Sequence, residues 1–373
     1  MLFSEVIGQE RLKGQMLRSI AEGRVSHAQL FLGPLGHGGL PLALAYAQYL
    51  TCTQREEGDA CGKCSSCSKA AKLIHPDIHF SFPFPAVEGR KICAEFLPEW
   101  REAVIASPYL NLHQWLLKFN AENKQANITA SECRDIIRRL NLSAFESAYK
   151  VMIIWLPEFL GKEGNTLLKI LEEPPDNTVF LLVAEKHDQM LNTILSRTQI
   201  TKIPALDHPV LAAVLENELA LDSDNALRIA SLSNGDYIEA TALAQHAVNE
   251  QAGMFREWLG MMLSKHDPLA LINWIEGFAA IGREGQKNFF SYGLYLLEEA
   301  LSMSISGSDS NRLQPTEVKV AKAMNHLVAD LISLQKLYQL FNDSSYHIER
   351  NAHPKILMLN LSLQVARLLG RNG

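Results

Sequence analysis

The chain has 373 residues, of which 47% are hydrophobic and 20% charged, and its formal net charge is −6. This length allows two or three domains of roughly 100–200 residues, and the composition excludes a disordered or collagen-like chain. The acidic balance argues against a stand-alone, sequence-independent DNA binder, because such proteins neutralise phosphates with a net basic surface.

Apolar runs and cysteine usage together predict a cytoplasmic protein. No apolar run reaches the roughly 18 residues of a membrane-spanning helix, and no basic segment leads into an apolar stretch at the N-terminus. Six cysteines are too few for a disulfide scaffold of this size, and four of them fall within one short stretch. We therefore expect no membrane partner.

The first elements have the order of a phosphate-binding loop. Apolar residues recur at helical spacing over residues 10–22, and residues 28–32 form a short apolar run that predicts a strand. The run ends in a glycine-rich loop at 33–39, and residues 40–50 are again helical in pattern. Strand, glycine-rich loop and helix follow one another in this way in phosphate-binding loops.

The loop keeps the glycines of that motif and has lost its charged parts. Gly33 and Gly38 have the separation found in G-x-x-x-x-G-K-[ST], where backbone N–H groups hold phosphate oxygens. Gly39 and Leu40 stand where the lysine and the magnesium-binding hydroxyl belong. The candidate loop residues are therefore Gly33, Gly36, Gly38 and Gly39. From the loop alone, a plain glycine-rich turn after a strand is an equal alternative.

A cluster of cysteines at 52–67 predicts a structural zinc. Cys52, Cys61, Cys64 and Cys67 have the spacing C-x8-C-x2-C-x2-C. Two residues between ligands let a turn present both sulfurs to one ion, and four thiolates suit tetrahedral zinc without an open coordination position. The alternatives are a C-x-x-C redox pair, which leaves two cysteines unexplained, and ordinary core cysteines.

Helices and buried strands alternate in the next part of the chain. They are predicted at 131–140, 150–155, 165–172 and 178–184. The strand at 150–155 ends in Trp155 and Leu156, where a functional nucleotide site places the acidic residues that hold magnesium and orient water, and Glu158 lies past that position. Such alternation implies a parallel sheet with helices on both faces.

Beyond Pro204 the strand patterns end. Apolar residues then recur at three- and four-residue steps, as in Phe255, Trp258 and Met262, which predicts packed helices. Residues 356–369 are apolar on more than one face, so we expect them to form the most buried helix. The predicted order is an α/β domain followed by all-α domains.

Several segments together carry a family resemblance over most of the chain. They are Val6-Ile7-Gly8-Gln9, residues 27–34, the four-cysteine module, N-T-L-L-K-I-L-E-E-P-P at 165–175, Leu195-Ser196-Arg197-Thr198, and the segment that begins at Asn351. In these segments the chain resembles the delta prime subunits of the bacterial DNA polymerase III clamp loader, AAA+ proteins related to gamma and tau. The resemblance implies an α/β AAA+ domain at 1–204 with its zinc module at 52–67, a helical lid at 205–247 and a helical collar at 248–373.

The resemblance also implies which residues act. In the family, gamma and tau carry an intact phosphate loop, whereas delta prime commonly lacks one and is a non-hydrolysing stator. The family's Ser-Arg-Cys motif supplies an arginine finger to ATP on the neighbouring subunit, and here Ser196 and Arg197 are kept while Thr198 replaces the cysteine. The alternative for Arg197 is an ion pair within its own domain. Ile238 stands where the lid's nucleotide-sensing arginine belongs.

The implied partners are the delta and gamma/tau subunits, the sliding clamp indirectly, and primer–template DNA in the assembled complex, within the nucleoid-associated replisome. ATP is expected to be bound weakly or not at all. One other interpretation is an active gamma/tau-type ATPase, which requires Lys at 39 and an acidic residue at 155. A zinc-bearing DNA-binding protein outside replication is another, and it predicts DNA affinity with a steep salt dependence.

The resemblance does not explain residues 82–124, because this stretch is longer than the family usually has. Trp100 and Trp115 lie in apolar patterns within it. A surface insertion with one or two helices is the interpretation we favour, and a docking surface for a partner protein is the alternative. Cys93 and Cys133 are expected to fill packing positions.

Overall fold

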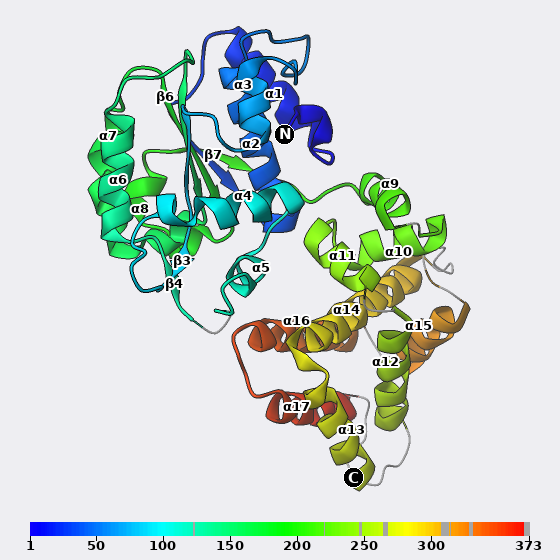
Figure 1. The fold of residues 1–373 in the computed structure, drawn as a ribbon. Helices are drawn as coiled ribbons and strands as arrows, with labels where there is room; N and C mark the ends of the chain where they lie inside the picture. The colour runs from blue at the N-terminus through cyan, green and yellow to red at the C-terminus, as the bar shows by residue number, and fades with distance from the viewer. Residues whose placement is uncertain are drawn as a thin grey trace. The chain divides into compact units, whose positions relative to one another are not determined.

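The computed structural model describes residues 1–121, 124–219, 221–245, 248–263, 268–306, 313, 315–327 and 331–368. The chain divides into two compact units (Figure 1). One is Met1–Leu211 together with Gly235–Ile238, and the other is Ala212–Asn234 together with Glu239–Gly373. The three-domain division at 204 and 247 stays a prediction.

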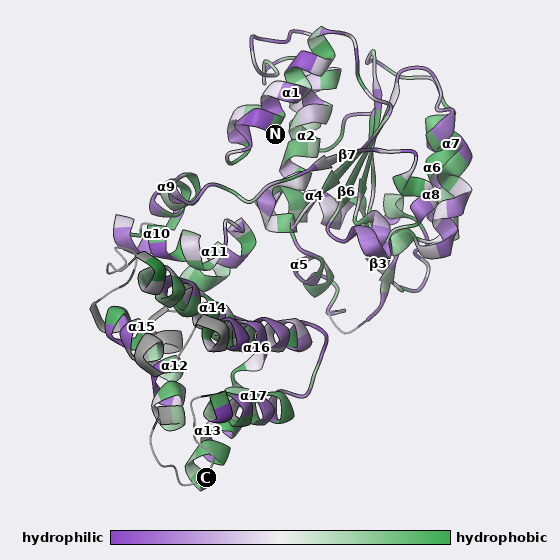
Figure 2. Ribbon diagram, turned by 180° about the vertical axis from the view of Figure 1, so that it is seen from behind, coloured by the Kyte–Doolittle hydropathy of each residue, from purple (hydrophilic) through white to green (hydrophobic). Residues whose placement is uncertain are grey.

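A five-stranded parallel sheet forms the centre of the first unit, in the order β2-β5-β6-β1-β7. Its strands are β1 (Ala28–Leu32), β2 (Ile78–Ser81), β5 (Lys150–Trp155), β6 (Thr178–Ala184) and β7 (Gln199–Lys202). Every residue of β5 and β6 is buried, as expected for parallel strands covered on both faces. The predicted parallel sheet is confirmed, and Figure 2 shows its hydrophobic strands between the helices.

Side chains of β5 alternate between two core clusters, one on each face of the sheet. Val151, Ile153 and Trp155 belong to one cluster, and Met152 and Ile154 to the other. The helices before and between the strands cover these faces: α1 (Glu10–Ala21), α2 (Gly39–Thr51), α3 (Ser65–Ala71), α4 (Leu97–Ala106), α5 (Leu112–Leu117), α6 (Ala130–Leu140), α7 (Leu168–Glu172) and α8 (Asn192–Leu195). Helices on both faces were expected from the alternating pattern, and the two clusters confirm them.

The helix predicted at 165–172 begins later than expected. Residues Pro157–Leu167 form 3-10 turns, and the α-helix is confined to Leu168–Glu172. Gly161 has φ 50° and ψ −139°, which are not helical angles, so it interrupts the approach to the helix. By contrast, the helix predicted at 131–140 is confirmed as α6.

Residues 82–124 contribute to the core of the first unit. The short strands β3 (Phe84–Pro85) and β4 (Ala126–Asn127) pair antiparallel and join the two ends of this stretch. Between them lie α4 and α5, as the prediction of one or two helices required. Their residues Trp100 and Trp115 are fully buried, with ring centroids 5.4 Å apart. The stretch is therefore more than a surface insertion, because its aromatic side chains complete one face of the sheet.

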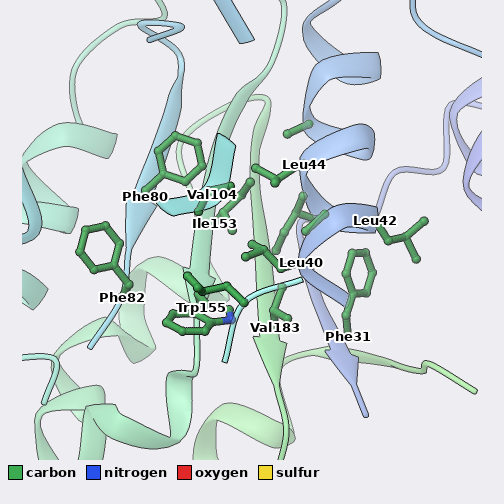
Figure 3. Packing of buried hydrophobic residues seen from close by; sticks show 14 of the residues in the cluster. Phe31, Leu40, Leu42, Leu44, Phe80, Phe82, Val104, Ile153, Trp155 and Val183 are labelled. Carbon is green, nitrogen blue, oxygen red and sulfur yellow. The ribbon is translucent and has the colours of Figure 1, made fainter. Parts of the chain in front are cut away.

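Trp155 joins this aromatic cluster to the sheet. Its ring lies 5.2 Å from that of Trp100, and its backbone is in register with Val183 of β6, which is in register with Phe31 of β1. Figure 3 shows Trp155 at the end of β5, in the cluster that also holds Leu40 of α2. The large apolar side chain of Trp155 thus fills the core beside the C-terminal end of β5.

In its described residues the second unit is built from helices. They are α9 (His208–Leu219) and α11 (Tyr237–Gln245), which both begin in the first unit, and α10 (Ser223–Leu232), α12 (Val248–Leu263), α13 (Pro268–Ala280), α14 (Gly282–Ser306), α15 (Pro315–Leu327), α16 (Leu331–Glu349) and α17 (Pro354–Leu368). Phe255, Trp258 and Phe341 are buried at its centre, with ring centroids 5.5–5.9 Å apart. Among the described helices, none combines the length and apolar character needed to cross a membrane.

A buried polar network joins three helices of the second unit. Arg228 of α10 forms an ion pair with Glu317 of α15, and Tyr292 of α14 donates a hydrogen bond of 2.8 Å to the same carboxylate. Because both charged side chains are almost fully buried, each depends on the other for its charge balance. Burial and the neighbouring Glu317 raise the pKa of Tyr292, which keeps its hydroxyl protonated as the donor.

The expectation that residues 356–369 form the most buried helix is wrong. In α17 only Met358, Leu361, Ser362 and Val365 are buried, and Ile356 is 68% exposed. Leu369 lies outside the described residues. In α2, by contrast, every residue except Tyr49 is buried, because this helix lies between the sheet and its neighbours α1 and α3.

The cluster around Trp155 leads to a first prediction. We expect Trp155→Ala to lower the free energy of unfolding of the first unit by about 3–5 kcal/mol, because it leaves a cavity beside Trp100. Urea unfolding followed by far-ultraviolet circular dichroism measures this loss. Phe145, which is 78% exposed, is the control, since Phe145→Ala should change stability by no more than about 0.5 kcal/mol. Equal effects of the two substitutions would contradict the packing role.

Candidate functional site

The glycine-rich loop connects β1 to α2, as predicted, and uses its own backbone to close a turn. Residues Leu35–His37 form a 3-10 turn, and Gly38 has φ 94°, a left-handed conformation that favours glycine. The N–H groups of His37 and Gly38 donate to the carbonyls of Pro34 and Leu35, at 3.0 and 3.3 Å. Two backbone donors of the kind that hold phosphate oxygens elsewhere are therefore bonded within the loop.

Side chains at the loop have little room. A Cβ at Gly39 would lie 3.1 Å from Cγ1 of Val183, and a Cβ at Gly33 would lie 2.7 Å from the carbonyl oxygen of Ile203. A side chain at either position therefore requires its neighbour to move. Gly33, Gly36, Gly38 and Gly39 are brought together in this turn, but nothing in it supplies the positive charge of a lysine.

Glu158 is the acidic residue nearest in sequence to the end of β5, and its carboxylate is held elsewhere. Oε1 accepts hydrogen bonds from the backbone N–H groups of Glu185 and Lys186, at 2.9 and 3.3 Å, just after β6. Oε2 is buried, with no hydrogen-bond partner among the described residues. Burial raises the pKa of Glu158 to about 6, against the opposing effect of these hydrogen bonds.

The four cysteines form a compact cluster whose geometry fits a tetrahedral metal ion. The Sγ atoms of Cys52 and Cys61 are 3.7 Å apart, those of Cys61 and Cys67 are 3.9 Å apart, and all four lie within 4.8 Å of one another. Tetrahedral zinc with Zn–S bonds of about 2.3 Å places its sulfurs roughly 3.8 Å apart. None of the four is in a disulfide. This group can hold a metal ion.

The backbone around the cluster supports thiolate ligands. The N–H groups of Cys61, Cys64 and Cys67 point to the sulfurs of Cys52, Cys61 and Cys64, at 3.3–3.5 Å. Gly62 has φ 68° and allows the turn between the second and third cysteines. Burial alone raises the pKa of the Cys64 thiol, but hydrogen bonds with Thr53 and Cys67 lower it to about 6.

The cysteine module is tied to the rest of the first unit at two points. Ser66 of α3 donates to the carbonyl of Thr51 at 2.7 Å and lies 2.9 Å from Nε2 of the buried His75. On the other side, the carboxylate of Asp59 accepts hydrogen bonds from the N–H groups of Phe3 and Ser4, both at 2.9 Å. Loosening the module therefore loosens the N-terminus and the end of α2 as well.

Arg197 lies between α8 and β7 and makes an ion pair at the surface. Its Nε donates to Oε1 of Glu172 at 2.7 Å, and its Nη1 donates to the carbonyl of Thr193 at 2.8 Å and to Oγ of Ser196 at 3.3 Å. The side chains of Arg197 and Glu172 are 29% and 48% exposed. The ion pair within its own domain is thus present in this chain, and the guanidinium remains accessible to solvent.

A family model described as "DNA polymerase III, delta subunit" matches residues 8–207. The match spans more than half of the chain and includes the glycine-rich loop, the four cysteines and Arg197. The chain belongs to this family of clamp-loader subunits. The predicted relationship to AAA+ clamp-loader proteins is therefore confirmed.

The relatives include delta' subunits and gamma/tau subunits of DNA polymerase III. The delta' subunit of DNA polymerase III from Pseudomonas aeruginosa is 28% identical over 266 residues, which are 69% of each chain. The delta' subunit from Haemophilus influenzae is 26% identical over 260 residues, 69% of this chain and 67% of the relative. The gamma/tau subunit from Mycobacterium bovis is 27% identical over 197 residues, 52% of this chain but only 27% of the relative. The match thus spans about a quarter of the gamma/tau relative.

The cysteine cluster leads to a prediction about zinc. We expect one zinc ion per purified chain by elemental analysis, and its loss in Cys64→Ser or Cys67→Ser, because each substitution removes a thiolate ligand. Loss of the ion should lower the free energy of unfolding of the first unit by about 1 kcal/mol or more, a fall in Tm of roughly 2–4 °C. Cys133→Ala is the control, since Cys133 lies outside the cluster and should leave the zinc content unchanged. Metal-free wild-type protein would contradict the zinc site.

The buried carboxylate of Glu158 leads to a prediction about pH. Its pKa is about 6 in the folded chain and 4.5 without burial, so the folded state holds the proton more tightly, and stability should fall as the pH rises from about 4.5 to about 6. Glu158→Gln should flatten this part of the profile, measured by urea unfolding at a series of pH values. The exposed Glu163→Gln is the control and should keep the wild-type slope. If stability depends on pH in the same way in Glu158→Gln and Glu163→Gln, the raised pKa of Glu158 is not the cause of the slope.

Proposed function

We propose that the chain is a non-hydrolysing, delta prime-type subunit of a DNA polymerase III clamp loader that donates Arg197 to an ATP site on a neighbouring subunit. The observation that carries the proposal is an asymmetry of charge. The groups that would act on the chain's own nucleotide are replaced by Gly39, Leu40 and Trp155, whereas an arginine that can reach outward is kept at the surface.

The loop and the end of β5 support the absence of hydrolysis. Phosphoryl transfer depends on a lysine and a magnesium ion to neutralise developing charge, and Gly39 and Trp155 offer neither a cation nor a metal ligand. Trp155 is fully buried against Trp100, so water and magnesium have no access to that position. An active gamma/tau-type ATPase requires a lysine at position 39 and an acidic residue at position 155, where this chain has Gly39 and Trp155.

The surroundings of Arg197 support a role in trans. Its pair with Glu172 is solvent-exposed, and such pairs contribute only about 0–1 kcal/mol, so a partner of higher charge can take the guanidinium away. The γ-phosphate of ATP on a neighbouring subunit is such a partner, and the planar guanidinium can donate two hydrogen bonds to it. In the free chain, Glu172 and the carbonyl of Thr193 accept hydrogen bonds from the side chain of Arg197.

The remaining parts of the proposal concern cofactor and partners. The cysteine cluster would hold a structural zinc, and the chain would assemble with delta and gamma/tau subunits and act on the sliding clamp and primer–template DNA only within that complex. The site of action would be the cytoplasmic replisome. The net charge of −6 favours this assembly role over an independent zinc-bearing DNA-binding protein.

Arg197 provides the test of the proposed function. We expect Arg197→Ala to assemble normally with gamma/tau and delta and to stop turnover at the ATP site it serves, since arginine fingers contribute on the order of 10³–10⁵-fold to kcat. The measurement is DNA- and clamp-stimulated ATP hydrolysis by the reconstituted loader, with assembly checked by size-exclusion chromatography.

Glu172→Gln is the matched control. It removes the partner of Arg197 in the free chain but leaves the guanidinium in place, so the stimulated ATPase rate should stay near that of the wild type. Unchanged turnover in an assembled Arg197→Ala loader would remove Arg197 from the mechanism. A loss of assembly in that variant would instead support the structural role of the ion pair.

A further inference from the structure

The space beside the degenerate loop is filled by the chain itself. Gly36 is buried, and a methyl group added to it would overlap the carboxylate of Asp236. Asp236 is distant in sequence but belongs to the same compact unit, since residues Gly235–Ile238 are part of the first unit. A negatively charged side chain of this protein therefore lies directly against the loop whose glycines resemble a phosphate cradle.

A second side chain covers the loop at Gly38. A Cβ at Gly38 would lie 3.3 Å from both Cε1 and the hydroxyl oxygen of Tyr109. Tyr109 comes from the 82–124 stretch, is 5% exposed, and accepts a hydrogen bond of 3.0 Å from the N–H of Ile7. Its ring centroid lies 4.6 Å from that of Tyr237, the residue next to Asp236. The two coverings therefore support each other.

The segment that carries Asp236 is held in place on both sides. Gly235 accepts a hydrogen bond of 3.1 Å from the N–H of Leu206, and its φ of 74° and close approach to the Leu206 backbone leave no room for a side chain. On the other side, Ile238 packs against the core of the first unit. Ile238 occupies the position of the nucleotide-sensing arginine in the lid, and in this chain its side chain makes apolar contacts with that core.

We propose that Asp236 and Tyr109 form an internal plug that keeps phosphate-bearing ligands out of the degenerate loop. Asp236 places a negative charge where the loop and the start of α2 would attract an anion, so it both occupies the position and repels a phosphate. Tyr109 closes the loop at Gly38, which gives the 82–124 stretch a role. The proposal deepens the non-hydrolysing function proposed above, because the chain would be closed to nucleotide as well as unable to hydrolyse it.

Ligand binding to the full-length chain tests the plug. The probes are pyrophosphate and ADP, measured by isothermal titration calorimetry with the wild type, Asp236→Ala, and Tyr109→Ala combined with Asp236→Ala. We expect pyrophosphate to bind Asp236→Ala about tenfold or more tightly than the wild type, because the competing charge is gone, and we expect ADP binding only in the double variant. Asp224→Ala, which removes an exposed aspartate of α10, is the control and should behave as the wild type.

The binding results distinguish a plugged loop from a loop that has only lost its lysine. If folded Asp236→Ala binds pyrophosphate no better than the wild type or the control, or if the wild type already binds ADP as tightly as the double variant, the plug is refuted. Asp236→Ala keeps the test decisive if the double variant fails to fold, since Asp236 is only partly buried. The loader ATPase with Arg197→Ala tests the proposed function independently, so either proposal can fail while the other stands.

Discussion

The burial of Trp155 at the end of β5 is the constraint on which the first unit depends. Its indole packs against Trp100, and through Val183 it is continuous with the rows of side chains that cross the sheet. An acidic residue at this position would be a buried, unpaired charge beside the ring of Trp100, which would destabilise the folded chain. The residue that closes the core therefore stands where, under the proposed function, a working ATP site would need a magnesium ligand.

Because the end of β5 is closed by Trp155, the candidate functional groups of the chain are the glycine-rich loop, the four-cysteine module and Arg197. The glycine-rich loop has two N–H groups hydrogen-bonded within its own turn, and the side chains of Tyr109 and Asp236 lie against it. The four-cysteine module is tied by hydrogen bonds to the N-terminus and to the end of α2, and its sulfurs can hold a metal ion. Arg197, in contrast, is held by an exposed carboxylate that it can leave. These features fit the proposed stator function, in which Arg197 acts on a neighbouring subunit.

Local patterns in the sequence were sufficient for part of this account. The four cysteines were predicted to meet because ligands two residues apart on a turn must converge, and the parallel sheet followed from apolar runs separated by helices. The departures from the phosphate-loop pattern at Gly39, Leu40 and Trp155 can be read from the sequence alone, because such a motif is defined by positions along the chain. The helix predicted at 165–172 is α-helical only from Leu168, because residues up to Leu167 form 3-10 turns, which apolar spacing does not distinguish from an α-helix.

Features that depend on distant contacts were not predictable. No sequence pattern gives Tyr109 or Asp236 a role, and only the folded chain brings both to the loop at Gly36 and Gly38. The burial of α17 was overestimated because helical spacing shows which residues are apolar but not which neighbours cover them. Likewise, Trp100 and Trp115 were assigned to a surface insertion, since periodicity alone does not show that their rings complete the core.

The most direct test of the central claim is the interaction of the purified full-length chain, alone, with Mg-ATP. Equilibrium binding and steady-state hydrolysis should both be measured, with and without primed DNA, because a hidden site would be revealed by either. The account predicts no hydrolysis above the protein-free rate and no saturable binding. Saturable turnover by the chain alone would contradict it, since Gly39, Leu40 and Trp155 would then coexist with a working nucleotide site.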